Sequence, residues 1–369
     1  MVSRPMTRAD VINQIESVLQ DSSNAKWSAA ELNLLLDDAI TEVSEAVPYV
    51  MRDVYQIESR TGIASSTLAN NLVDATESQF VSAAFDKGKV VYNTTDKTWA
   101  VIEGFTSATT VALSADIMAS GEHYEIYNKA CWSRKQINIE DSSDFLWIIG
   151  AVYPVTPGYN MVPFQNMRNV TLYSQNKIAE IDVSSVDDSK DADADDDVHL
   201  YVARQHKLNP MTDLDATNNG GTAVGATTMI LAGLTDADTP IYKDTLFTVQ
   251  GDATSAQDLR YTYRVTDDAT IATQATTISF FPKLEAAVAT GAAVTFVRST
   301  LTPDLERIIV QMVAGEALMS ESISLINTVT NGDAHGQYFR VGERMAEKAR
   351  ARLKGMVDVD LRAERVYSR

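Results

Sequence analysis

The sequence predicts an α+β protein in which helices from the two ends of the chain form a helical bundle, and two antiparallel β modules, each a small barrel or sandwich, are inserted between them. Three observations predict this fold class. Apolar residues recur at helical spacing near both ends of the chain, and much of the interior alternates with a period of two. The interior also holds two stretches that resemble copies of one module.

A chain of 369 residues, 45% of them hydrophobic, is long for a single core, so several domains are expected. The changes of period set the boundaries between them. The expected segments are N-terminal helices at 1–50, a first β module with a middle β region at 51–212, an inserted second β module at 213–299, C-terminal helices at 300–354 and an extended arm at 355–369.

The N-terminal region predicts two helices. The first spans Arg8 to Gln20 and ends before a polar run at 21–24. The second starts at Ser28, where Glu31 completes a capping box, and it ends before Pro48 because the residue preceding a proline avoids helical geometry. The apolar stripe of this second helix comprises Leu32, Leu35, Leu36, Ile40 and Val43.

From residue 50 onward, turn residues separate short segments that are rich in β-branched and aromatic residues. Even spacing of this kind is typical of a small antiparallel barrel or sandwich. The expected strands of the first module are Lys89–Asn93, Trp99–Glu103, Thr110–Leu113 and His123–Tyr127, followed in the middle region by Gln136–Ile139 and Val170–Tyr173.

The second module is expected to follow a flexible linker at Asn218–Gly221, and it reads as an insertion that can fold independently. Its expected strands are Thr228–Leu231, Thr245–Val249, Tyr261–Val265, Thr277–Phe281 and Ala293–Val297.

The two modules align with each other near their ends. Ala108–Leu113 matches Ala275–Phe280, and in both copies a glycine turn and a further strand follow, at 119–127 and at 289–297. This similarity favours a duplicated module. Thr and Val recur in any β-rich chain, however, so the sequence leaves both interpretations open.

The C-terminal region predicts two more helices. Thr302 is expected to cap the first, with Pro303 at the first helical position, where its missing N–H costs no hydrogen bond. The second is expected at about 336–354, with Gly355 as its C-cap. Beyond Gly355, apolar residues alternate with charged ones, which predicts an extended strand. The apolar residues of this strand are Val357, Val359 and Leu361.

The net charge of −19 limits the kinds of partner that the chain is expected to bind. An acidic surface repels phosphate, which disfavours a sequence-specific DNA-binding protein. The exception is Arg340–Arg369, with nine basic and five acidic residues. This segment predicts either a contact surface for an acidic partner or a solvated helix end.

No sequence feature indicates a disulfide or a membrane segment. Cys131 is the single cysteine, which excludes an internal disulfide and a multi-cysteine zinc site. No stretch approaches the roughly 20 apolar residues that a membrane helix needs, so no membrane partner is expected.

Motifs with chemical meaning are absent from the sequence. It has no P-loop, dinucleotide-binding fingerprint, nucleophile elbow or paired-histidine zinc helix, so we expect no enzyme, no cofactor and no metal site. Asp191, Asp193 and Asp195 match the first offsets of a calcium loop, but Asp196 takes the glycine position, so 187–197 is expected to be a mobile acidic loop. His123, His199, His206 and His335 are expected to be structural, and Trp132, Trp147 and Tyr153 to belong to the core rather than to a sugar-binding platform.

The order of elements resembles that of the head-to-tail adaptor, or connector, proteins of tailed bacteriophages. A helix and a capped helix precede a β region containing Val90–Asp96 and Ala115–Glu122, and two C-terminal helices and a tail follow it. The inserted module, with Asp244–Val249 and Gly291–Val294, is similar to small β domains that recur in phage structural proteins. The resemblance in helical order covers 8–47 and 302–354, and the chain is much longer than simple adaptors.

The resemblance implies a virion structural protein at the head–tail junction, assembled in the host cytoplasm. It implies a homo-oligomeric ring, commonly of twelve copies, that docks beneath the portal protein and contacts tail or stopper/nozzle proteins. Genomic DNA would pass through the lumen without specific binding, because attraction to phosphate would slow it. The alternative is a capsid-surface or tail decoration protein that binds host glycans.

The arm at 355–369 is predicted to contact a neighbouring subunit or the portal. An isolated strand is unstable in water and needs a partner sheet, and cations around the arm would steer it towards an acidic surface. The predicted interface residues are Lys354, Val357, Val359, Leu361, Arg362, Arg365 and Arg369.

Overall fold

The computed structural model describes residues 6–140, 145–153, 167–173, 177–184, 186, 197–235, 240–250, 262–281, 283–284, 287–326 and 332–367. The chain forms two compact units. The first combines residues 1–49 with 204–369, and the second comprises residues 50–203.

The expected fold class is wrong. The chain is mostly β, with several sheets and one six-stranded barrel, and only 26% of it is helical, so it is not a helical bundle that carries inserted modules. The middle region explains much of the difference. Its segments build two sheets besides those of the modules, of four and of three strands.

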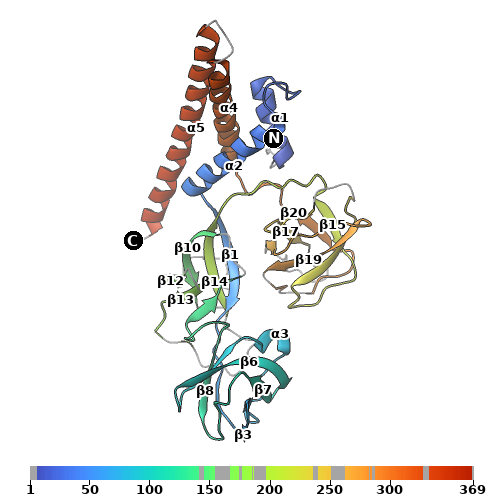
Figure 1. Ribbon diagram of the computed structural model, residues 1–369, viewed down its shortest axis with the longest axis vertical. Helices are drawn as coiled ribbons and strands as arrows, with labels where there is room; N and C mark the ends of the chain where they lie inside the picture. Colours follow the sequence, from blue (N-terminus) through green and yellow to red (C-terminus); the bar gives the residue numbers. More distant parts are fainter. Residues whose placement is uncertain are drawn as a thin grey trace. The chain divides into compact units, whose positions relative to one another are not determined.

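The helical part of the first unit joins the two ends of the chain around one core (Figure 1). Thr7 and Asp10 form a capping box at the start of α1. At α2, Ser28 Oγ accepts a hydrogen bond from Glu31 N at 3.2 Å, which is one half of the predicted capping box, while the Glu31 carboxylate accepts from the Ser320 hydroxyl at 3.4 Å. Thr302 Oγ1 likewise accepts from Leu305 N at the start of α4. The helices of the chain are α1 (Arg8–Leu19), α2 (Ala29–Ala46), α3 (Ala83–Asp86), α4 (Pro303–Ile326) and α5 (Gly332–Tyr367).

The shared helical core confirms the predicted apolar stripe of α2, with Leu35 as its half-buried margin. Trp27 precedes α2, is buried, and donates its indole N–H to the backbone oxygen of Ala317 on α4 at 3.0 Å. This bond fixes the start of α2 against the C-terminal helices. Other buried members of the core include Val11, Ile15, Ile40, Val43, Leu305, Ile309, Met312 and Val313.

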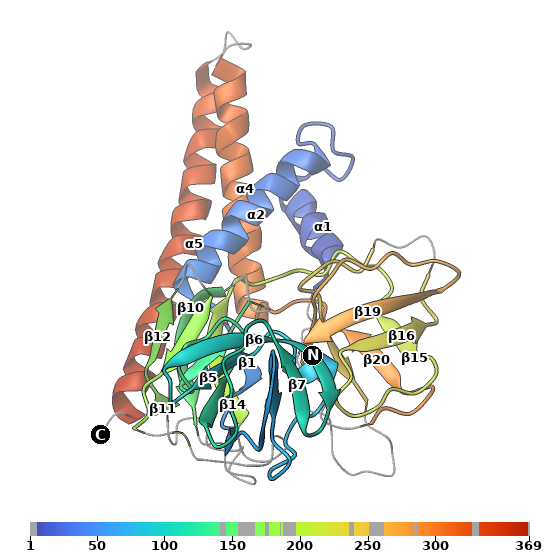
Figure 2. The ribbon, with the colours of Figure 1, turned by 60° about the horizontal axis from the view of Figure 1, so that its bottom comes forward.

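The first unit also contains a closed antiparallel barrel with the strand order β15-β16-β19-β18-β17-β20. Figure 2 shows β15, β16, β19 and β20 of this barrel. Four aromatic rings fill its centre. Phe247 stacks on Tyr263 at 5.5 Å between ring centroids and meets Phe280 edge-on at 5.6 Å. The strands are β15 (Asp215–Asn218), β16 (Thr228–Ala232), β17 (Leu246–Val249), β18 (Tyr263–Val265), β19 (Ala275–Phe281) and β20 (Ala293–Phe296).

The predicted linker at Asn218–Gly221 is wrong. Asn218 is the last residue of β15, is buried, and donates its side-chain amide to Val288 O at 3.1 Å. Gly220 and Gly221 have φ of 110° and 69°, the left-handed region that favours glycine, so the segment begins a turn inside the barrel. The predicted linker therefore begins with the last residue of a barrel strand.

The second unit holds three sheets. A seven-stranded sheet has the order β2-β8-β5-β6-β7-β4-β3, a four-stranded sheet β1-β14-β10-β11 and a three-stranded sheet β12-β13-β9. The strands are β1 (Tyr49–Gln56), β2 (Thr61–Ile63), β3 (Ser66–Leu68), β4 (Asn71–Val73), β5 (Val90–Asn93), β6 (Thr98–Ser107), β7 (Thr110–Leu113), β8 (His123–Tyr127), β9 (Gln136–Asn138), β10 (Phe145–Val152), β11 (Met167–Arg168), β12 (Val170–Tyr173), β13 (Ile178–Ile181) and β14 (Asp197–Arg204).

The two modules share one strand order, which supports their duplication. The order β8-β5-β6-β7-β4 corresponds to β20-β17-β18-β19-β16 of the barrel. The segment 61–68 pairs with β8 through β2 and with β4 through β3, just as β15 pairs with both β20 and β16. The glycine turns also match, since Gly121 N donates to Ala64 O and Gly291 N donates to Asn218 O, both at 2.7 Å.

The barrel generates a test by truncation. We expect residues 210–298 to fold alone, because Met211 and Leu214 belong to the barrel core and β15 joins β16 to β20. Residues 220–298 lack β15, which leaves two open strand edges, so they are expected to be unfolded or aggregated. Amide dispersion in nuclear magnetic resonance spectra measures both. Equal dispersion in the two fragments, or none in either, would contradict the role given to β15.

Candidate functional site

The predicted interface lies on a helix and not on an extended arm. α5 runs without interruption to Tyr367, and Gly355 is not in the left-handed conformation of a C-cap. The strand prediction is therefore wrong, because the backbone of this segment continues α5 as a helix. Lys354 is exposed. The other predicted interface residues are Val357, Val359, Leu361, Arg362 and Arg365 on α5, and Arg369, which lies outside the described residues.

The α4–α5 hairpin is built on a contact between two glycines. A Cβ atom on Gly315 would lie 2.7 Å from Gly342 O and 2.9 Å from Ala346 N, so any side chain there would force the helices apart. Ala346 and Ala349 continue this small-residue contact and are fully buried. The two backbones therefore touch with no large side chain between them.

The register of this contact shows that α5 outruns α4. Because Gly315 lies against Gly342 in an antiparallel pair, Pro303 at the start of α4 falls opposite Lys354. The remaining turns of α5, up to Tyr367, extend about 20 Å further. Over this last part of α5, beyond Lys354, the helix extends past the start of α4, so α4 does not pack against it there.

Arg350 joins α5 to the N-terminal helices. Its Nε and Nη2 atoms donate to the two carboxylate oxygens of Glu42 at 2.7 and 2.9 Å, and Nη2 also donates to Glu316 at 2.6 Å. The bond to Glu42 raises the pKa of Arg350, whereas burial raises the pKa of Glu316. Bidentate geometry of this kind fixes orientation as well as distance.

The half of the hairpin nearer the connection between α4 and α5 exposes apolar side chains. Ile323 on α4 is 63% exposed, and Phe339 and Val341 on α5 are 42% and 51% exposed. Nearby, Lys26 Nζ lies 3.0 Å from the Tyr338 hydroxyl, which ties the segment between α1 and α2 to this part of α5. Clustered exposed apolar groups often mark interaction surfaces.

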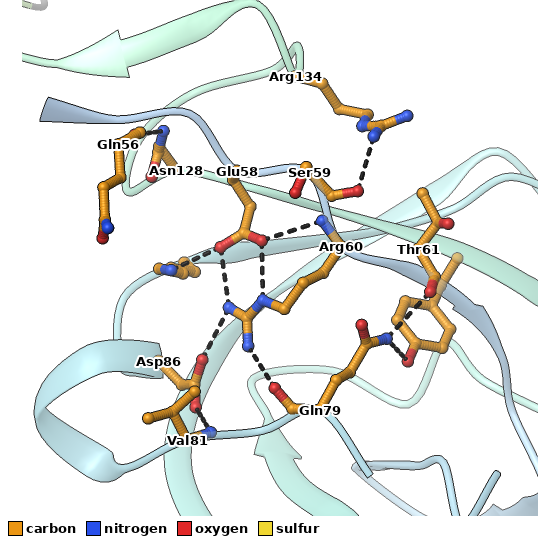
Figure 3. Close-up of polar contacts among 12 residues, drawn as sticks. Gln56, Glu58, Ser59, Arg60, Thr61, Gln79, Val81, Asp86, Asn128 and Arg134 are labelled. Carbon is orange, nitrogen blue, oxygen red and sulfur yellow. Dashed lines mark hydrogen bonds and ion pairs between the residues drawn. The ribbon is translucent and has the colours of Figure 1, made fainter. Parts of the chain in front are cut away.

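A buried cluster of charged groups lies in the second unit (Figure 3). Arg60 is fully buried and donates from Nε and Nη2 to the two oxygens of Glu58, each at 2.8 Å. Its Nη2 also lies 2.8 Å from Asp86, and its Nη1 donates to Gln79 O at 3.0 Å. Lys89 Nζ pairs with Glu58 and lies 3.6 Å from the centre of the Phe85 ring.

The electrostatics of this cluster indicate a structural role. Burial opposes ionisation of Glu58, but the hydrogen bonds from Arg60 and the charge of Lys89 outweigh it and lower its pKa to about 2. Burial lowers the pKa of Lys89. Two carboxylates and two cations balance, and each bonds to another member, so the cluster fixes the segment that enters the first module rather than performing acid–base chemistry.

A related contact ties the barrel to its own entry segment. Asp244 accepts from Arg264 of β18 at 2.6 Å, and the Arg264 side chain is 1% exposed. Lys207, on the chain leading into the barrel, lies 3.1 Å from the other oxygen of Asp244. Both modules thus place a carboxylate between an arginine and a lysine where the chain enters.

Two aromatic residues that were assigned to the core are exposed. Tyr153 is buried as predicted, but Trp132 is 51% exposed and Trp147 is 43% exposed, so the core assignment is wrong for both tryptophans. Trp132 meets Tyr173 edge-on at 5.2 Å between ring centroids. Glu180 accepts from the Tyr173 hydroxyl at 3.2 Å and from the Gln136 amide at 2.8 Å, so polar groups border the rings.

A cavity of about 270 Å³ lies within the first unit, lined by parts of α1, α2, the 205–210 segment and the barrel. Its charged groups pair with one another, Arg8 with Asp37 at 2.7 Å and Lys207 with Asp244 at 3.1 Å. His206 bonds through its two ring nitrogens to Thr300 and to Val47 O, and burial lowers its pKa. These groups satisfy one another, so the lining gives no sign of a ligand.

Other residues singled out in the sequence do not assemble a site. Among the described residues, no three His, Cys, Asp or Glu side chains gather as metal ligands, and no helix is both long and apolar enough to cross a membrane. Cys131 is buried, which raises its thiol pKa to about 12. The acidic loop lies outside the described residues up to position 196, and Asp197 begins β14.

Comparison of the chain with protein-family models, with curated proteins and with solved structures finds no match. The geometry above is therefore the basis for any functional assignment, together with the resemblance in element order.

The Glu58 cluster generates a stability prediction with a matched control. Glu58→Gln removes one charge from the buried cluster and leaves two cations, Arg60 and Lys89, with one carboxylate, Asp86, which is expected to lower the free energy of unfolding by about 3–5 kcal/mol. Glu140→Gln makes the same chemical change in the exposed pair with Lys129 and is expected to cost less than about 1 kcal/mol. Urea unfolding at neutral pH measures both. Similar costs for the two variants would contradict the role of the cluster.

The same carboxylate predicts a pH dependence. Its pKa is about 2 in the folded chain against a usual 4.5, so its contribution is complete above pH 4.5 and is lost as the pH falls towards 2. The difference in unfolding free energy between the parent and Glu58→Gln is therefore expected to shrink over this range. A difference that stays constant down to pH 2 would show that the cost arises from packing alone.

Proposed function

We propose that this chain is a virion structural protein, the head-to-tail adaptor of a tailed bacteriophage. It forms a homo-oligomeric ring beneath the portal, links the capsid to the tail and lines the channel through which the DNA leaves. The observation that carries the proposal is the α4–α5 hairpin. It exposes apolar side chains in the half nearer the connection between the two helices, and at its other end α5 extends beyond the start of α4. Such surfaces are suited to burial against neighbouring copies.

Charge and element order also support the proposal. A net charge of −19 suits a channel in which DNA must slide without being held. Helices from both ends of the chain pack around one core. Their order along the chain is the feature in which the sequence resembles phage adaptors. The portal on one side and a tail or stopper/nozzle protein on the other are the partners that this function needs.

The end of α5 gives the first functional prediction. Deleting residues 357–369 is expected to leave the melting temperature nearly unchanged, because α4 ends its contact opposite Lys354 and the core residue Leu353 is retained. The deletion is expected to abolish co-sedimentation with portal rings of the same phage. A control in which a Gly/Ser segment replaces 357–369 separates chain length from sequence. If the truncated chain unfolds, the segment belongs to the subunit core and the docking role fails.

A second candidate function is a capsid-surface or tail decoration protein that binds host glycans. The exposed Trp132–Tyr173 pair, bordered by Glu180 and Gln136, favours it. Exposed aromatic faces with adjacent hydrogen-bonding groups are suited to sugar rings, which have an apolar face and polar edges.

A glycan array separates the two functions. The adaptor proposal predicts no specific binding to any glycan. The decoration function predicts binding that Trp132→Ala abolishes and Trp99→Ala preserves, because Trp99 is 65% exposed on β6 but lies outside this pair. Specific binding with this pattern would contradict the adaptor assignment.

A further inference from the structure

The exposed side of α5 carries a stripe of cations. Arg340, Arg344, Lys348 and Arg352 recur every four residues, and all four are exposed. Residues 340–354 contain six basic and two acidic residues, although the whole chain is strongly acidic. Like charges one turn apart destabilise a helix, so this stripe does not serve the folding of α5.

The stripe has little compensation within the chain. Arg340 donates to Gly336 O of its own helix, and Arg352 donates to the neutral amide of Gln311 at 3.3 Å. For Arg344 and Lys348, no carboxylate lies within ion-pair distance among the residues that the structure describes.

The exposed side of α2 has the opposite character. Residues 29–46 contain five acidic and no basic residues. Asp37 pairs with Arg8 and Glu42 with Arg350, whereas Asp38 and Glu45 are exposed and form no ion pair within the described part of the chain. Leu34, one turn before Asp38, is 68% exposed. The face therefore combines two unused carboxylates with an exposed apolar residue.

The two faces cannot pair within one chain. α5 meets α2 through Arg350, and Lys348 lies two residues away, which is more than half a turn around the helix. The cationic stripe therefore points away from the α2 of its own chain. If the stripe of one copy contacts the acidic face of a second copy, the two copies use different surface patches. A head-to-tail contact of this kind, repeated from copy to copy, forms a ring when the rotations between successive copies add up to a full turn.

We infer that the cationic stripe of α5 in one copy docks on the acidic face of α2 in the next copy. This rests on the proposed ring, whose subunit contact it specifies. Asp38 and Glu45 are about 10 Å apart along α2, close to the roughly 12 Å between Arg344 and Arg352, so both carboxylates can meet cations of the stripe. Leu34 and Val341 supply apolar area beside the charges.

The net charge of −19 favours a protein partner over DNA for this stripe. Phosphates approaching the stripe would also meet the acidic remainder of the chain, whereas α2 of a second copy presents a short acidic face of matching length.

Two charge-reversed variants test the contact by sedimentation velocity. Arg344→Glu with Lys348→Glu places two carboxylates in the middle of the α5 stripe, opposite Asp38 and Glu45, and Asp38→Lys with Glu45→Lys places two cations opposite the unchanged stripe. Each variant alone is expected to need a concentration about tenfold or more above that of the parent before it associates. A 1:1 mixture is expected to associate like the parent, because each reversed face then meets its complement. Circular dichroism verifies that both variants fold.

A matched control reverses Glu343 and Glu347 to Lys, which changes two charges on the flank beside the stripe without reversing any of its cations, and is expected to leave association intact. If the parent forms rings and both reversed variants do so equally well, the α5–α2 contact is wrong while the ring stands. If the parent stays monomeric at every concentration, the proposed function fails together with the contact. Loss of affinity for a labelled duplex DNA in the α5 variant, with association unchanged, would reassign the stripe to nucleic acid and overturn the inference.

Discussion

The close approach of α4 and α5 at Gly315 and Gly342 is the constraint on which the helical part of the structure depends. Because the two backbones touch, there is no room for a side chain between them, and the helices must run side by side over their shared length. The apolar residues of α4 are then left to face α1 and α2, which they do through Ile309, Met312 and Val313. The cations lie on the outer side of α5, where Arg344 and Lys348 are exposed and have no ion pair with any residue that the structure describes.

The β modules are held by a different kind of contact. Each has an apolar centre, but each also buries an arginine that pairs with a carboxylate near the point where the chain enters, Arg60 with Glu58 and Arg264 with Asp244. A buried ion pair is weak support for stability, since removing two charges from water is costly. Its geometry is strict, however, so we infer that these pairs set the orientation of each module relative to its entry segment. The two pairs do not occupy equivalent positions, because Arg60 precedes β2 whereas Arg264 lies on β18, the counterpart of β6.

Local signals in the sequence predicted the elements well. Ser28 and Thr302 cap the expected helices, and β7, β8 and β12 have the predicted bounds, because caps and alternation act within a few residues. Pairing could not be predicted in the same way. Asn218–Gly221 has the composition of a linker. Only the hydrogen-bond partners of Asn218 in the folded chain show that this residue is the last one of a barrel strand.

The remaining errors have the same origin. The alternation at 357–361 suits a strand, but this segment directly follows a long helix. Extending a helix by further residues costs less free energy than forming a strand that has no partner. Trp132 and Trp147 look like core residues in a β segment, and only the fold shows that nothing in the described chain covers them. Gly315 and Gly342 carry no signal of their own until the two helices are placed side by side, so the contact that organises the hairpin was invisible in the sequence.

The central claim is that this chain is a ring subunit whose neighbours meet through different patches of the surface. Electron microscopy of the full chain at high concentration, with two-dimensional class averages and the symmetry of the particles, tests it most directly. The account predicts closed rings of one copy number, with every subunit in the same orientation. Monomers at all concentrations, or dimers related by a twofold axis, would contradict it.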